Sequence, residues 1–145
     1  MISSTLYELD FHAWTQEQAA KMRAGRLAEL DINHLTEELE SMGATERREV
    51  IHRLTVLITH LLKWRFQPSR RGNSWRLTIE IQRSEVEQVL DQNPSLRPYL
   101  PEFCAKAYAT AVLRAAKETG LDKRNFPVQL PFTAEQAMNS DFWPE

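Results

Sequence analysis

Apolar residues recur with helical spacing between residues 50 and 64, and this stripe constrains the fold more than any other feature. Its members follow the i, i+4, i+7, i+11 and i+14 positions of one helix face. Such a broad apolar face predicts a helix at the centre of a bundle, with partners on more than one side. The stripe consists of Val50, Leu54, Leu57, Leu61 and Trp64, and Ile51, Ile58 and Leu62 widen it.

Similar patterns, interrupted by glycine and proline, predict further helices. Gly25, Gly43 and Gly120 are predicted to end helices, because glycine is common just past a helix terminus. Thr15 is predicted to begin the first helix in a capping box with Gln18. No run alternates with the period of a strand. The fold class is therefore predicted as all-α, an irregular bundle of about five helices with an ordered C-terminal tail and a short terminal helix. The predicted helices cover residues 15–24, 32–42 (after an Asp31 cap), 44–66, 74–90, 101–119 and 133–138.

Length and composition bound the function. The 145 residues suit a single domain over 1–145, and 42% apolar with 26% charged residues excludes a disordered chain. A net charge of −2 argues against a wholly basic nucleic-acid binder but leaves room for a local basic patch. No apolar run is long enough to span a membrane, and residues 1–4 lack a signal-peptide pattern, so we expect a cytoplasmic protein.

Recognisable catalytic motifs are absent from the sequence. Cys104 is the single cysteine, which excludes an intramolecular disulfide and a thiolate zinc site, and we predict a buried, inert thiol. No glycine-rich phosphate loop, serine elbow or dinucleotide fingerprint occurs. We therefore expect no cofactor and assign no metal ligands.

One candidate polar cluster follows from the predicted helices 32–42 and 44–66. A short connection at Gly43 would make them antiparallel neighbours, so that polar flanks of both helices meet. Carboxylates and imidazoles in such a cleft suit metal binding or acid–base chemistry of a hydrolytic enzyme. The structural alternative is a set of interhelical salt bridges with boundary histidines. The candidates are His34, Glu38, Glu49, Arg53 and His60.

A second candidate is the basic segment from Lys63 to Arg83, where six bases face one acid for a local charge of +5. Tryptophans interleave with the bases, and a helix start near Asn73 offers backbone N–H groups, a mixture typical of phosphate or nucleic-acid contact. The alternative is that the arginines pair with acidic residues of the first two helices, and that the tryptophans belong to the core. The anion-binding candidates are Arg65, Arg70, Arg71 and Arg76.

Polar residues also interrupt the apolar face of helix 74–90. Gln82 lies between Ile79 and Val86, with Thr78 beside it. A buried amide left unpaired costs on the order of 1–3 kcal/mol, so we expect a partner. Gln82 is predicted either to bond a backbone group near Gln67 or to line a pocket with Thr78 and Arg83.

Several sequence blocks occur in a recognisable order along nearly the whole chain. The blocks are Tyr7-x-x-Asp10-Phe11-x-x-Trp14, the run from Leu35 to Gly43, the run from His60 to Pro68, Ser74-Trp75-x-x-Thr78-Ile79-x-x-Gln82-Arg83, Asn93-Pro94-Ser95-Leu96 and Phe132-Thr133-x-Glu135-Gln136. Together they resemble a bacterial family, domain of unknown function 29, which is common in cyanobacteria and proteobacteria. The resemblance implies a single all-helical domain with no assigned activity or site residue.

Taken together, these features favour an interaction module that binds an anionic or protein partner. The alternative is a metal-binding or hydrolytic enzyme that uses the candidate polar cluster. A homodimer is a further possibility, because helix 101–119 carries a face of small alanines and the tail is apolar.

Overall fold

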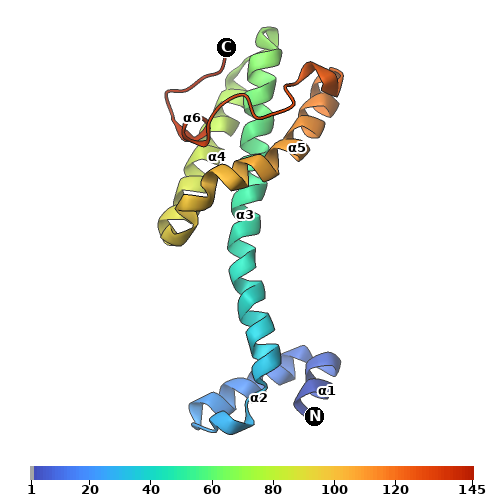
Figure 1. Cartoon of the computed structure of the whole chain (residues 1–145), viewed down its shortest axis with the longest axis vertical. Coiled ribbons are helices and arrows are strands. Elements are labelled where there is room, and N and C mark those ends of the chain that lie inside the picture. Colours follow the sequence, from blue (N-terminus) through green and yellow to red (C-terminus); the bar gives the residue numbers. More distant parts are fainter. Residues whose placement is uncertain (1) are drawn as a thin grey trace. The chain divides into compact units, whose positions relative to one another are not determined.

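The computed structural model describes residues 2–145, with side chains from Leu6 onward, and over this range it contains helices and turns but no strand. The prediction of an all-α fold is confirmed. No helix in the described range is both long enough and apolar enough to cross a lipid bilayer. The α-helices are α1 (Ile2–Leu9), α2 (Phe11–Arg23), α3 (Ile32–Phe66), α4 (Asn73–Gln92), α5 (Leu100–Thr119) and α6 (Ala134–Met138) (Figure 1).

The chain divides into two compact units. Unit 1 comprises Met1–Thr45 and contains α1, α2 and residues 32–45 of α3. Unit 2 comprises Glu46–Glu145 and contains residues 46–66 of α3 together with α4, α5 and α6. The assignment of residues 1–145 to a single domain stays a prediction.

Helix α3 runs through Gly43 without a break, so the prediction that a helix ends there is wrong. With it falls the prediction of two antiparallel helices over 32–42 and 44–66, because α3 is one helix of 35 residues. A glycine inside a helix costs only about 1 kcal/mol relative to alanine, which its helix-forming neighbours offset. Gly25 (φ +73°) and Gly120 (φ +79°) adopt the left-handed conformation of helix ends, as predicted, whereas Gly43 does not.

Helix α2 begins four residues earlier than the predicted cap. The Asp10 side chain accepts a hydrogen bond from the backbone N–H of Ala13 at 3.0 Å and caps the helix. The capping box predicted for Thr15 and Gln18 is therefore wrong, and Gln18 is buried instead. Asp31 does precede α3, as predicted, and accepts from the backbone N–H of a residue in its first turn.

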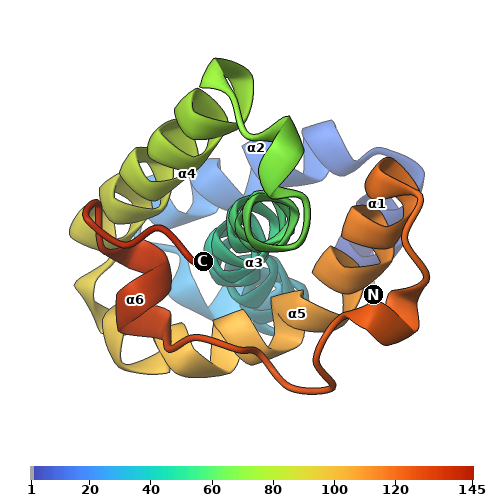
Figure 2. The same cartoon turned by 90° about the horizontal axis from the view of Figure 1, so that it is seen from above.

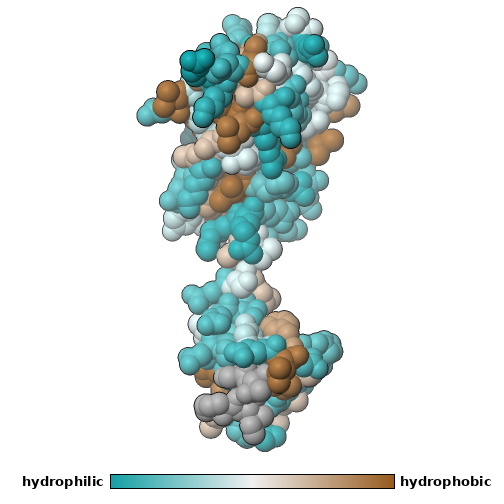
Figure 3. Space-filling model, turned by 90° about the vertical axis from the view of Figure 1, so that its right-hand side faces the viewer, coloured by the Kyte–Doolittle hydropathy of each residue, from teal (hydrophilic) through white to brown (hydrophobic). Residues whose placement is uncertain are grey.

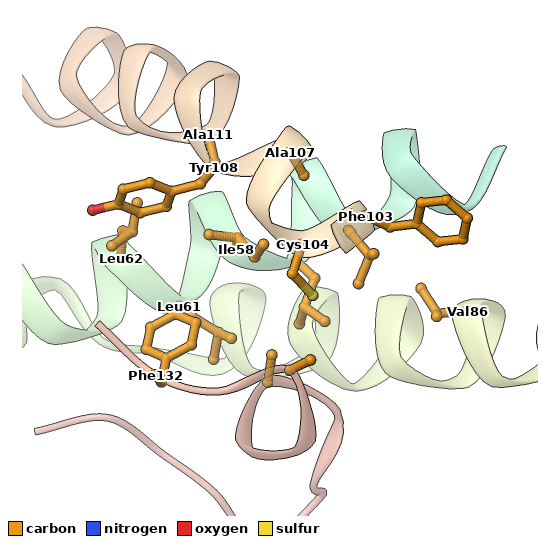
Figure 4. Close-up of a cluster of buried hydrophobic side chains, with 14 of the residues drawn as sticks. Ile58, Leu61, Leu62, Val86, Phe103, Cys104, Ala107, Tyr108, Ala111 and Phe132 are labelled. Atoms are coloured by element: carbon orange, nitrogen blue, oxygen red, sulfur yellow. The ribbon is translucent and has the colours of Figure 1, made fainter. Parts of the chain in front are cut away.

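Unit 2 is built around residues 46–66 of α3. Viewed along α3 (Figure 2), α4, α5 and the C-terminal segment with α6 lie around it. Every member of the predicted stripe from Val50 to Trp64 is buried, which confirms the prediction of a central helix. Figure 4 shows side chains of α3, α4 and α5 meeting in this core, among them Ile58, Val86 and Cys104.

The C-terminal tail is ordered, as predicted, and closes the core of unit 2. Phe126 and Phe132 are buried, and the Trp143 ring lies 4.7 Å from the Trp64 ring between centroids. The Thr133 hydroxyl and the Gln136 side chain form a capping box that starts α6. The tail is therefore part of the unit and not an appendage to it.

Candidate functional site

Three arginines of unit 2 lie near the connection between α3 and α4, and we call them the arginine surface. Arg65 lies in the last turn of α3, Arg70 in the turn that follows, and Arg76 in the first turns of α4. None of them forms an ion pair with a described residue, so the predicted alternative of pairing with acidic residues of the chain is not what the structure shows there. Two other exposed arginines of unit 2 do have acidic partners: Arg97 contacts Glu87 and Asp91, and Arg124 contacts Asp122.

Arg71, the fourth predicted anion-binding residue, forms hydrogen bonds with backbone groups of the chain. Its Nε donates to the carbonyl oxygen of Trp64 at 2.6 Å, and its Nη2 donates to the carbonyl oxygen of Pro144 at 3.2 Å. The guanidinium also lies 5.2 Å from the centroid of the Trp64 ring. Arg71 therefore ties the tail to the end of α3, and its donors are directed at carbonyl groups of the chain.

Helix α4 begins beside the arginine surface without a capping side chain. Its N-cap is Gly72, which has no side chain to offer to the first N–H groups. The start of a helix carries a partial positive charge that favours anions. The start of α4 and the three arginines therefore all contribute positive electrostatic potential.

The tryptophans in this region belong to the packed structure. Trp64 is only 7% exposed, and a hollow of about 320 Å³ is lined by Trp64, Arg76, Glu80 and Trp143. The guanidinium of Arg76 lies about 6 Å from both tryptophan rings, and that of Arg83 lies 5.3 Å from the Trp143 ring. Because arginines already cover the ring faces, stacking of nucleic-acid bases is disfavoured there.

Arg83, predicted to line a pocket with Gln82 and Thr78, is a buried polar residue of α4. It is 5% exposed, and it donates to the carbonyl oxygens of Ala137 (2.8 Å) and Phe142 (2.7 Å). Its Nη1 has no partner among the described residues. Burial lowers the pKa of Arg83. Arg83 lies one helical turn after the buried Ile79, and this spacing places it on the buried face of α4.

The two residues predicted on that face behave differently. Gln82 is half-buried, and its Oε1 has no hydrogen-bond partner among the described residues. Thr78 donates to the carbonyl oxygen of Ser74 in its own helix. Gln67 donates to the carbonyl oxygen of Thr119, so the predicted contact between Gln82 and this region is not formed.

Unit 1 contains a connected polar group, which we call the Asp31 cluster: Tyr7, Trp14, Asp31, His34 and Glu38. Asp31 Oδ2 lies 2.7 Å from Nδ1 of His34 and accepts from Nε1 of Trp14 at 3.1 Å. The Tyr7 hydroxyl donates to Oε1 of Glu38 at 2.5 Å, and the Tyr7 ring stacks on the His34 ring with centroids 3.9 Å apart. Helices α1, α2 and α3 each contribute to the cluster.

The electrostatics of the Asp31 cluster keep Asp31 ionised. Burial raises the pKa of Asp31, but hydrogen bonds from His34 and Trp14 outweigh it, and the pKa is lowered overall. The hydrogen bond to Glu38, followed by burial, raises the pKa of Tyr7 to about 12. An ionised Asp31 beside Nδ1 holds the imidazole with Nε2 as its proton acceptor.

Gln18 of α2 contacts the backbone of the Asp31 cluster. It is 1% exposed, and its Oε1 accepts from the backbone N–H of Asp31 at 2.8 Å, while its Nε2 has no partner among the described residues. Neither Gln18 nor Asp31 was predicted to belong to a site, because both were interpreted as helix caps. Gln18 lies within α2 and Asp31 directly before α3, and no sequence pattern links these two positions.

The predicted candidate cluster is not assembled as expected, because the cleft between two antiparallel helices does not exist. Glu49 bonds Arg53 one helical turn away at 3.3 Å, and Arg53 also lies 3.9 Å from Glu85. Nδ1 of His60 lies 2.9 Å from the carbonyl oxygen of Val56, and burial lowers the pKa of His60. In the described part of the chain, no group of three acidic, histidine or cysteine side chains is placed to hold a metal ion.

Comparison with known proteins gives a family for this fold. The family model described as Domain of unknown function DUF29 matches residues 6–143. The chain belongs to this family. The match confirms the resemblance seen in the sequence, and it includes both the Asp31 cluster and the arginine surface. No curated protein and no solved structure matches the chain. Since the DUF29 family has no assigned activity, function has to be argued from the two sites.

Proposed function

We propose that this DUF29 chain is a binding module whose anionic partner docks on the arginine surface of unit 2. The observation that carries the proposal is the state of Arg65, Arg70 and Arg76, none of which forms an ion pair with a described residue. Their guanidinium groups supply forked donors that suit phosphate or carboxylate oxygens. The uncapped start of α4 adds to the attraction for an anion.

The three arginines do not contribute equally. Arg70 and Arg76 are exposed, whereas Arg65 is half-buried, with its guanidinium 5.2 Å from the Phe66 ring centroid. Arg70 and Arg76 therefore make the first contacts with a partner, and Arg65 adds field strength behind them. Arg71 supports the surface from within by holding the tail.

The test uses two fluorescent probes, a single-stranded oligonucleotide of 20 bases and an acidic peptide without phosphate. We expect the full chain to bind the probe that carries the partner's chemistry, with affinity that falls as salt rises. Arg70→Glu/Arg76→Glu should weaken binding at least tenfold. The control is Arg97→Glu/Arg26→Glu, which changes net charge equally at exposed arginines that already have acidic partners.

Equal loss in both double variants would show a response to net charge alone and would overturn the assignment to this surface. Absence of binding to either probe at low salt would overturn the proposal itself. Binding to the oligonucleotide alone identifies a phosphate backbone as the ligand, and binding to the peptide alone identifies an acidic protein.

A second candidate function, hydrolysis, has one observation in its favour, the pairing of Asp31 with His34. A carboxylate on Nδ1 leaves Nε2 free to take a proton from water, which is general-base catalysis. We expect any esterase activity on p-nitrophenyl acyl substrates to disappear in His34→Gln and to persist in His52→Gln, where the histidine is exposed and outside the cluster. Equal activity in the two variants would exclude His34 as the base.

A further inference from the structure

Unit 1 exposes an unusual share of its apolar side chains. Trp14 is its single buried apolar residue among the described side chains, and it exposes more large apolar residues than unit 2, which is more than twice as long. A unit with so little core is typical of a surface that binds another protein. The exposed residues of unit 1 are Leu9, Phe11, Met22, Leu27, Ile32, Leu39 and Met42.

Part of this surface forms a line along α3, which we call the unit 1 stripe: Ile32, Leu39 and Met42. These side chains are 59%, 66% and 66% exposed. With half-buried Leu35 they follow spacings of three, four and three residues, the pattern that packs one helix along another. The stripe therefore suits a helical partner.

Unit 2 also carries an apolar surface, which lies along α5. Two adjoining hollows of about 740 and 670 Å³ lie between α5 and the segment after it, and they share Ala105, Tyr108 and Val128 as lining residues. We call them together the α5 groove. Val128 is 98% exposed and Leu113 56%. Figure 3, which turns the α5 side of unit 2 toward the viewer, shows hydrophobic side chains exposed among hydrophilic ones.

Charge indicates what covers this groove. Unit 1 has eight acidic and three basic residues, for a net charge of −5, whereas unit 2 has twelve acidic and fifteen basic residues, for +3. Lys123 and Arg124 line one end of the α5 groove and Glu135 the other, and the exposed charged residues of α5 are three bases and two acids: Lys106, Arg114, Lys117, Glu102 and Glu118. These residues give the groove and α5 a small net positive charge, so two such grooves do not complement each other by charge. An acidic helix with an apolar stripe complements the groove, and unit 1 of another copy is such a partner.

We propose that two copies of this chain associate, with the unit 1 stripe of one copy docked in the α5 groove of the other. If the exchange is mutual, the contact forms twice around a two-fold axis, which brings a single-helix contact toward the 1,200–2,000 Å² of a stable interface. The interaction is independent of the arginine surface. The association gives the exposed apolar side chains of the unit 1 stripe a defined binding partner.

The first experiment measures mass by sedimentation velocity over a range of concentrations. We expect a species of twice the 16.9 kDa chain mass. Leu39→Asp in the stripe and Val128→Asp in the groove should each weaken association at least tenfold. Leu77→Asp, which places the same charge on an exposed apolar residue of α4, should leave it unchanged. A monomer at every concentration, or equal loss in Leu77→Asp, would overturn the proposal.

The second experiment identifies the partner surfaces by disulfide trapping in a Cys104→Ala background. Chains with Leu39→Cys are mixed with mass-labelled chains carrying Val128→Cys, and we expect mixed disulfides on mild oxidation. Leu39→Cys mixed with Leu77→Cys is the control and should give few. When both Leu39→Cys and Val128→Cys are placed in one chain, a disulfide formed within that chain at high dilution would overturn the assignment to a second copy.

Discussion

The two units of this chain are stabilised by different kinds of interaction. Unit 2 surrounds the second half of α3 with α4, α5 and the tail, and its core contains twenty-one buried hydrophobic residues. Among its described side chains, unit 1 has one buried apolar residue, Trp14, and it is held by the hydrogen bonds and ring contacts of the Asp31 cluster. Stability should therefore depend on side-chain volume in unit 2 and on protonation in unit 1.

The largest effect expected from this difference is in the core of unit 2. Leu61 is fully buried, so Leu61→Ala leaves a cavity and should lower the free energy of unfolding by about 2–5 kcal/mol. Leu9→Ala is the control in unit 1, because Leu9 is 80% exposed and lies outside the unit 1 stripe, and its loss should change stability by less than about 0.5 kcal/mol. Urea denaturation followed by circular dichroism measures both. Similar destabilisation by the two substitutions would contradict the distinction between the units.

The next effect concerns the polar anchor that unit 2 does contain. Arg83→Leu removes both donors from the carbonyl oxygens of Ala137 and Phe142, which lie on the tail. The loss of two hydrogen bonds from a charged donor leaves both carbonyl oxygens unpaired. This loss should lower the free energy of unfolding by about 3 kcal/mol and expose the tail to proteolysis. Arg97→Leu, at an exposed arginine with acidic partners, should cost about 1 kcal/mol or less. A tail that resists protease in Arg83→Leu would show that apolar contacts hold it alone.

The sequence predicts unit 2 well because one mechanism dominates there. The spacing from Val50 to Trp64 is set by the burial of one helix face, and all five residues are buried as predicted. Gly120 ends α5 as predicted because the left-handed conformation is required there. Gly43 misled the prediction because its conformation is helical, and no local feature distinguishes it from a terminating glycine.

The sites were harder to predict than the fold. His34 and Glu38 were proposed with partners on a second helix, but their partners are Asp31 and Tyr7. These contacts depend on how α1 and α2 return to the start of α3, which no periodicity encodes. The run of basic residues in the sequence predicts the arginine surface. It does not predict that Arg71 bonds the carbonyl oxygen of Pro144, because that contact depends on where the end of the chain lies in the fold.

The dependence of unit 1 on protonation gives a smaller, pH-dependent effect. The folded-state pKa of Asp31 is lower than its ordinary value near 3.8, so its contribution to stability is present above that value and is lost as pH falls through the lowered pKa. The Nε1–H resonance of Trp14, which donates to Asp31, reports this loss in an acid titration by NMR. Asp31→Asn should remove the transition. The Nε1–H resonance of Trp64, in the core of unit 2, is the internal reference, and a shift of both resonances together would contradict an origin in unit 1.

The smallest expected effect is a rate that measures how well the core of unit 2 excludes reagents. Burial raises the pKa of the Cys104 thiol to about 11, so at pH 8 about one thiol in a thousand is ionised. Because Cys104 is fully buried, alkylation by iodoacetamide has to await opening of the structure, and native protein should react far more slowly than protein in urea. Leu61→Ala should speed the reaction in proportion to its destabilisation, whereas Leu9→Ala should leave the rate unchanged. Fast alkylation of the native chain would show that the α5 side of unit 2 opens locally, and the contrast between a closed unit 2 and an open unit 1 would then fail.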